Sequence, residues 1–216
     1  GVTGVQTCAL PISRGVAVGN VYRYIQEEIV IPDYTVAEDK VEEEIGKFAA
    51  AMAATLKQLD TIRQKALDEM GPEEAAIFEA HMQIAQDPSL SDGIKSLVES
   101  GHTNVVAATA QTIETFANIF LGMEDPYMRE RGADIKDIGD RLMRNMLGMN
   151  PRGLSHISGE VILVAQDLAP SDTASLDKNV VKGIVTAAGG PTSHAAIMAR
   201  TLEIPAVMGV GDIESF

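Results

Sequence analysis

The feature that most constrains the fold is a change of hydrophobic period along the chain. From Val36 to about Gly148, apolar residues recur every three or four positions, as in amphipathic helices. Segments rich in β-branched residues, typical of strands, lie before and after this stretch. The order strand, helices, strands predicts that a helical bundle is inserted into an α/β domain.

Short breaks divide the helical stretch. Gly71-Pro72 suits the end of one helix and the first turn of the next. Asp87-Pro88 breaks or kinks the second segment, Thr103 suits the N-cap of a third, and Asp125-Pro126 opens a fourth. We therefore predict an antiparallel bundle of four amphipathic segments.

The flanking segments predict the α/β part. Gly15–Tyr24 is the first strand candidate, and short apolar runs near residues 161–164, 180–185 and 206–208 are the others. Residues 171–176 and 193–202 fit helices. The predicted fold is α+β overall, with an α/β domain at 14–32 and 149–216 and a helical domain at 33–148. Residues 1–13 fit neither period, and we expect them to be a non-native tail without function.

Composition narrows the classes of function. The chain carries 31 acidic and 17 basic residues, a net charge of −14, which argues against nucleic-acid binding. An acidic surface suits a basic protein partner, and solubility alone accounts for it equally well. Cys8 is the only cysteine, so no internal disulfide is expected. We find no apolar run of about 20 residues and no signal-peptide pattern, and we expect a cytoplasmic protein without a membrane span.

Residues 189–200, Gly-Gly-Pro-Thr-Ser-His-Ala-Ala-Ile-Met-Ala-Arg, carry the clearest chemical signal. Gly189 and Gly190 permit a tight turn and close approach of the backbone to a ligand. Thr192 and Ser193 are good N-caps, so His194 is expected in the first turn of a helix, where the helix dipole favours an anion. An imidazole there can act as a nucleophile, and its ordinary pKa of about 6.5 leaves it largely neutral near neutral pH.

This string resembles the phosphohistidine motif of Enzyme I, the phosphoenolpyruvate-protein phosphotransferase of the bacterial sugar phosphotransferase system. Three further segments carry the resemblance: residues 76–81, 130–139 and 167–173. The resemblance implies a swivelling phosphohistidine domain interrupted by a helical domain that docks the carrier protein HPr. It also implies that His194 takes a phosphoryl group from phosphoenolpyruvate and passes it to HPr.

The resemblance extends to other residues. It implies that Thr173 hydrogen-bonds and orients His194, although a hydroxyl after Pro170-Ser171 is otherwise explained by helix initiation. The HPr-docking face it implies comprises Ile77, His81, Ile84 and Arg131. A histidine among apolar helix residues, such as His81, is more often simply buried. Arg200 suits either a phosphate or a carboxylate such as Glu203.

Relatives in this family are longer, and their C-terminal barrel binds phosphoenolpyruvate and Mg²⁺. We expect neither cofactor nor metal in this chain, because no cluster of His, Cys or Asp has metal-ligand spacing. Two alternatives stay open. One is the phosphohistidine domain of a pyruvate phosphate dikinase-like or phosphoenolpyruvate synthase-like enzyme, and the other is a non-catalytic helical docking module.

Overall fold

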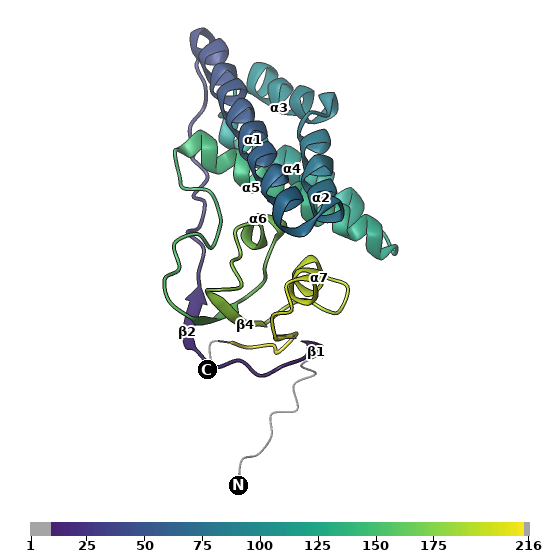
Figure 1. The fold of residues 1–216 in the computed structure, drawn as a ribbon. Coiled ribbons are helices and arrows are strands. Elements are labelled where there is room, and N and C mark those ends of the chain that lie inside the picture. Colours follow the sequence, from purple (N-terminus) through teal and green to yellow (C-terminus); the bar gives the residue numbers. More distant parts are fainter. Residues whose placement is uncertain (1–9, 214–216) are drawn as a thin grey trace. The chain divides into compact units, whose positions relative to one another are not determined.

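The computed structural model describes residues 10–213, which form two compact units (Figure 1). The sheet unit contains the described residues up to Glu27 and those from Arg152 onward. The helical unit spans Glu28–Pro151. The chain thus leaves the sheet unit once and returns to it once. The predicted class, an α/β domain interrupted by a helical bundle, is confirmed.

The sheet unit is built on five strands in the order β1-β5-β4-β3-β2. Strands β2, β3, β4 and β5 run parallel to one another, and β1 pairs with β5 in the antiparallel direction. Because parallel neighbours need crossover connections, helices lie between successive strands: α6 follows β3, and α7 follows β4. The strands are β1 (Leu10–Ser13), β2 (Asn20–Tyr24), β3 (Val161–Ala165), β4 (Val181–Thr186) and β5 (Ala206–Met208).

The core of the sheet unit lies between the sheet and α7 (His194–Thr201). Leu163, Ile184 and Met208 are fully buried on β3, β4 and β5. They belong to one apolar cluster with Ala195, Ala196 and Ala199 of α7. Small alanine side chains let the helix approach the sheet closely, and this packing fixes the start of α7 relative to the ends of the strands.

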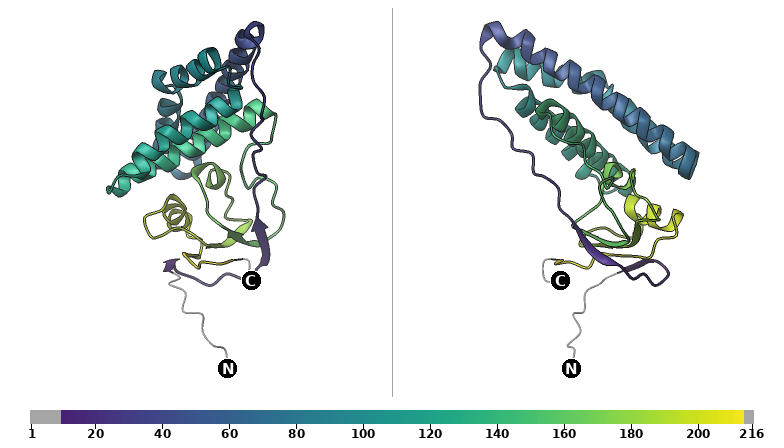
Figure 2. Two further views of the ribbon diagram at one scale, coloured as in Figure 1. Left: turned by 180° about the vertical axis from the view of Figure 1, so that it is seen from behind. Right: turned by 60° about the vertical axis from the view of Figure 1, so that its left-hand side comes forward.

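Five helices form the helical unit: α1 (Val41–Met70), α2 (Pro72–Ala85), α3 (Pro88–Gly101), α4 (Val105–Leu121) and α5 (Pro126–Leu147). A 3₁₀ turn, Glu38–Lys40, precedes α1. Asp87 and Asp125 cap α3 and α5 by accepting hydrogen bonds from the backbone N–H of Ser89 and Tyr127, both at 2.8 Å. Figure 2 shows α4 and α5 running side by side.

Two glycines allow this close pairing of α4 and α5. A Cβ atom at Gly132 would lie 2.7 Å from Leu121 Cγ, and one at Gly139 would lie 2.7 Å from two side-chain carbons of Ile113. The two positions are seven residues apart, so they lie on the same face of α5. The α4–α5 interface therefore depends on the absence of side chains at both positions.

The bundle differs in detail from its prediction. The second predicted segment is two helices, α2 and α3, because Pro88 lacks the N–H that would continue α2 and Asp87 caps a new helix. The N-cap of α4 is Asn104, whose side chain accepts a hydrogen bond from Ala107 N at 2.9 Å, instead of Thr103. Asn104 also donates to the carbonyls of Pro32 and Tyr34, which holds it at the cap.

The start of the chain differs as well. Residues 1–9 lie outside the described residues. Leu10–Ser13 are part of the fold, because they pair with β5 and bury Ile12. The register is irregular between Pro11 and Ser13, so this short strand has no alternating pattern to recognise. The first predicted strand is shorter than expected, since only Asn20–Tyr24 of Gly15–Tyr24 is paired.

Candidate active site

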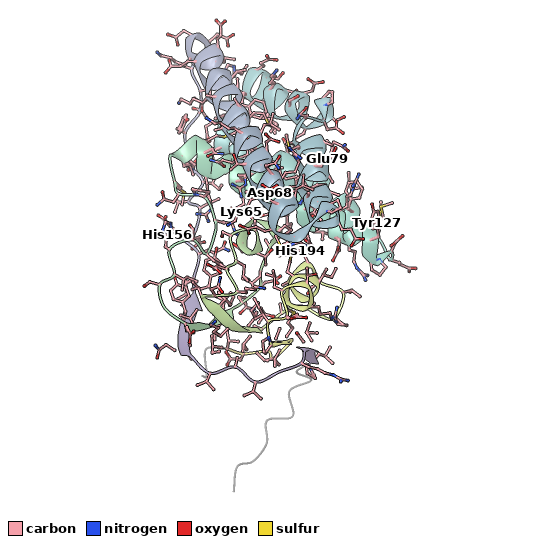
Figure 3. All side chains as sticks on the ribbon, viewed as in Figure 1. Lys65, Asp68, Glu79, Tyr127, His156 and His194 are labelled. Atoms are coloured by element: carbon pink, nitrogen blue, oxygen red, sulfur yellow. The ribbon has the colours of Figure 1, made fainter. Side chains whose placement is uncertain are left out.

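The loop between β4 and α7 carries the Gly-Gly-Pro-Thr-Ser-His motif. Gly189 has a φ of +95°, a backbone conformation that favours glycine. Ser193 caps α7: its Oγ accepts a hydrogen bond from Ala196 N at 3.2 Å and donates one to Gly190 O at 2.9 Å. These contacts place His194 at the first residue of α7 (Figure 3).

His194 is half-buried and contacts Thr173, as the resemblance implied. Its Nε2 atom lies 2.9 Å from Thr173 Oγ1. Thr173 is only 1% exposed, and its hydroxyl is also 3.2 Å from Pro170 O. Two residues that are 21 positions apart in the sequence are thus brought together by α6 (Pro170–Thr173) and α7.

The single hydroxyl hydrogen of Thr173 links the contact to the protonation of the ring. When the Thr173 hydroxyl donates to Pro170 O, the hydroxyl oxygen accepts a hydrogen bond from Nε2–H. When the hydroxyl donates to His194 Nε2, that hydrogen bond occupies the lone pair of Nε2. In both arrangements Nε2 is unable to attack another atom while the bond persists. Any reaction at Nε2 would therefore require this hydrogen bond to break first.

Sequence reasoning missed Asp172, which precedes Thr173 and is fully buried. Its carboxylate accepts hydrogen bonds from Tyr24 and Gln26 and forms an ion pair with Arg152. Burial, followed by the charge of Asp172, raises the pKa of the Tyr24 hydroxyl. The partners lie 20 to 148 positions away in the sequence, so no local pattern could have revealed them.

Arg200 supports the motif loop. Its Nη1 donates to the carbonyl oxygen of Pro191 at 2.7 Å, and its Nε donates to that of Ile12 at 3.3 Å. From the sequence, a phosphate or the carboxylate of Glu203 was the expected partner of Arg200. The structure instead gives it backbone carbonyls, so Arg200 joins α7 to the loop and to β1.

Neither packing nor backbone strain among the described residues explains the identity of two further motif residues, Gly190 and Thr192. A Cβ atom at Gly190 would have no atom within 4 Å. Its φ also lies outside the left-handed region, so neither crowding nor backbone strain requires glycine there. Thr192 is exposed, one residue before the cap.

In the helical unit, two of the four residues predicted for a docking face line one groove. Ile84 and Arg131 both border a cavity of about 160 Å³. Its other walls come from α3, α4, α5 and the turn before α3: Asp87, Leu90, Ile113, Phe116, Phe120, Ile135 and Ile138. The groove is apolar, with one carboxylate and one guanidinium among its lining residues.

The other two residues lie differently. His81 is 0% exposed, with Nε2 at 3.1 Å from Asp134 Oδ1, and its ring packs edge-on against Phe78. It therefore does not present a surface for a partner, and the prediction that it lies on the docking face disagrees with this structure. The physical reason is that His81 joins α2 to α5. Ile77 is half-buried and does not line the groove.

No helix among residues 10–213 is both long and apolar enough to cross a bilayer. Within the same residues, no three His, Cys, Asp or Glu side chains are grouped so that they could hold a metal ion.

Comparison with known proteins places the chain in a family. The family model described as the N-terminal part of PEP-utilising enzymes matches residues 9–131, and that of their mobile domain matches residues 157–216. An NMR solution structure of an Enzyme I protein is 41% identical in sequence to this chain, with a TM-score of 0.79. The match covers 97% of this chain and 85% of the chain in that structure. The chain belongs to the Enzyme I family of PEP-utilising enzymes.

Further relatives support this membership. A structure described as the N-terminal domain of a nitrogen Enzyme 1 is 27% identical, with a TM-score of 0.64, and the match covers 97% of this chain and 86% of that one. The phosphoenolpyruvate-protein phosphotransferase of Streptococcus equinus is 44% identical over 204 residues. That match covers 94% of this chain and 35% of the relative, so the chain spans about a third of this curated family member.

Proposed function

We propose that the chain is the phosphoryl-relay part of a phosphoenolpyruvate-protein phosphotransferase. His194 receives a phosphoryl group that originates from phosphoenolpyruvate and passes it to a histidine of HPr. The observation that carries the proposal is the placement of His194 at the first residue of α7 with Nε2 on the Thr173 hydroxyl. The family membership supports it independently.

The chemistry required of His194 is simple. A lone pair on a neutral ring nitrogen attacks phosphorus, a P–N bond forms, and the P–O bond to the enol oxygen breaks. The released enolate takes up a proton at its terminal carbon and becomes pyruvate. Transfer to HPr repeats the step with a histidine of HPr as the nucleophile. Because phosphoryl transfer depends mainly on positioning and charge stabilisation, the residues around His194 chiefly orient the ring.

The site offers features that suit the phosphorylated ring. The N-terminal end of α7 carries a partial positive charge, which favours a dianion. The motif backbone at Gly190 has no side chain that would obstruct the phosphoryl oxygens. The proposal assigns the phosphoenolpyruvate and Mg²⁺ sites to the barrel of the longer relatives, which is outside these 216 residues.

HPr is proposed to dock on the groove of the helical unit bordered by Ile84 and Arg131. Apolar side chains form most of its lining, as in the centre of many protein interfaces, and an arginine is a frequent anchor there. The net charge of −14 suits a basic carrier. A cytoplasmic location remains a prediction of this proposal.

The test is to incubate the purified chain with phosphorylated HPr and to measure intact mass. We expect the chain to gain the mass of one phosphoryl group, reversibly, and the phosphoryl bond to be labile in acid. His194→Ala should gain none. His156→Ala is the matched control, because His156 is exposed in the loop before β3 and well separated from His194 (Figure 3). Phosphorylation of His194→Ala to the wild-type level would refute the proposal.

A further inference from the structure

The carboxylate of Asp172, next to Thr173, accepts five hydrogen bonds. Oδ1 accepts from the Tyr24 hydroxyl at 2.6 Å, from Gln26 Nε2 at 2.9 Å and from Arg152 Nε at 3.1 Å. Oδ2 accepts from Arg152 Nη2 at 2.7 Å and from Ala169 N at 2.8 Å. Asp172 itself is 0% exposed.

These five bonds join separate segments of the sheet unit. Tyr24 ends β2, and Gln26 is two residues further along. Arg152 is the first residue of the sheet unit after the helical unit. Ala169 is the N-cap of α6. One carboxylate therefore holds two distant parts of the chain, residues 24–26 and Arg152, to the start of α6.

Helix α6 needs this support because it is very short. It comprises only the four residues Pro170–Thr173. A helix of one turn does not persist by its own hydrogen bonds, so contacts from elsewhere must hold it. Asp172 supplies them, because it is anchored from outside and also closes on the backbone N–H of Ala169.

The effect reaches His194 through Thr173. Thr173 follows Asp172 directly, and its hydroxyl lies 2.9 Å from His194 Nε2. The bidentate ion pair with Arg152 offsets the charge of Asp172. Asp172 therefore acts on the histidine mainly through the geometry of α6.

We propose that Asp172 is a positioning residue for His194: it fixes α6 so that the Thr173 hydroxyl holds one ring nitrogen in one orientation. The inference rests on the proposed function of His194, because the orientation matters for phosphoryl transfer. A rotated ring or a displaced hydroxyl changes which nitrogen carries the proton and where its lone pair points.

The test compares Asp172→Asn with wild type in the 216-residue chain, using nitrogen-15 NMR of the His194 ring. Wild type should show one dominant tautomer with a hydrogen-bonded Nε2. Asp172→Asn should shift the ring signals towards those of Thr173→Val, which lacks the hydroxyl. The rate of phosphoryl exchange with phosphorylated HPr should fall on the order of tenfold to a hundredfold. Asp177→Asn, at an exposed carboxylate in the turn after α6, should leave both readouts unchanged.

The double variant separates positioning from a general loss of structure. If Asp172 acts through Thr173, then Asp172→Asn combined with Thr173→Val should give the ring spectrum of Thr173→Val alone, since effects through one contact are not additive. A ring spectrum of wild-type form in folded Asp172→Asn would overturn the inference. So would a further shift in the double variant.

A milder variant covers the case in which Asp172→Asn does not fold. Tyr24→Phe removes one of the five donors and should move the ring signals in the same direction by a smaller amount. No shift in folded Tyr24→Phe would then overturn the inference. The proposed function has its own test: it fails if wild type accepts no phosphoryl group. In that case the ring signals of the same samples still decide whether Asp172 positions His194.

Discussion

Arg200 donates a hydrogen bond from Nη1 to the carbonyl oxygen of Pro191, which lies 2.7 Å away and three residues before His194. The same side chain donates to Ile12 O of β1. The last turn of α7 is thereby bonded to the loop from which the helix begins. The guanidinium acts as a brace for the motif, a role that lysine cannot reproduce because it lacks two donors in a fixed fork.

We therefore expect Arg200→Lys to slow phosphoryl exchange at His194 on the order of tenfold, because the motif loop loses its fixed geometry. The final extent of phosphorylation should not change, since the nucleophile remains. Quenched-flow exchange with phosphorylated HPr measures the rate. Lys178→Ala, at an exposed position, is the control. An unchanged rate in Arg200→Lys would show that the brace does not affect transfer.

Gly139→Ala should destabilise the helical unit by about 1–3 kcal/mol, because the new Cβ would overlap Ile113 across the α4–α5 interface. Gly46→Ala is the matched control: Gly46 is exposed on α1, and a Cβ there would meet no atom within 4 Å. That change should stabilise by about 0.5–1 kcal/mol, since alanine is the better helix former. Urea unfolding measures both, and equal effects would contradict the packing argument.

The two motif glycines should respond differently to alanine. Gly189→Ala should cost on the order of 1–3 kcal/mol of stability, because its φ of +95° is strained for any residue with a Cβ. Gly190→Ala should leave stability unchanged and slow phosphoryl exchange, if its backbone approaches the phosphoryl oxygens. Thermal unfolding and exchange rates decide. Wild-type exchange by a folded Gly190→Ala would remove Gly190 from the site.

The proposed docking groove predicts which apolar substitution weakens HPr binding more. Ile84→Ala should weaken HPr binding by about 1–2 kcal/mol, whereas Ile77→Ala should have a smaller effect, because Ile84 lines the groove and Ile77 does not. Titration of labelled HPr measures both, with circular dichroism as a check of folding. Added salt should reduce the association rate towards a basic partner. The reverse order of the two variants would place the docking site elsewhere.

Glu74 predicts a pH dependence of stability. Burial raises the pKa of its carboxyl above the ordinary value of 4.5, and the charge of Glu73 adds to the effect. Its Oε2 has no hydrogen-bond partner among the described residues. The folded chain therefore binds the Glu74 proton more tightly than the unfolded chain, and stability falls as pH rises from 4.5 to the raised pKa.

Glu74→Gln should remove the loss of folding stability that wild type shows as pH rises. Its gain in unfolding free energy over wild type should be larger at about pH 7 than at about pH 4, where wild type retains the proton. Glu79→Gln, at an exposed position on α2, should show no such difference. A gain for Glu74→Gln that is the same at both pH values would mean that the titration of Glu74 is not responsible.

Local patterns predicted most helices and strands because their causes are local. Apolar spacing and the Pro and Asp residues at Asp87-Pro88 and Asp125-Pro126 define helix starts, and the structure has caps at both aspartates. Strand β1 could not be predicted in this way, because Leu10 pairs with Met208 near the other end of the chain.

The same limit applies to the site. The motif predicted that His194 begins a helix, because that depends on its immediate neighbours. The contact with Thr173 came only from the family resemblance, and the partners of Asp172 were not predicted, since Tyr24 lies 148 positions away. For His81, the apolar neighbours indicated burial, and that interpretation proved better than the resemblance.

The hydrogen bonds to Asp172 also lie where the chain passes between the two units. Two connections join the sheet unit to the helical unit, one after Glu27 and one before Arg152. Gln26 lies beside the first connection, Arg152 begins after the second, and both are bonded to the same carboxylate. A pull on either linker would therefore act first on the bonds of Asp172, which adjoins the threonine in contact with His194. The ends of both linkers and the one-turn helix that contacts His194 are thus held by a single carboxylate.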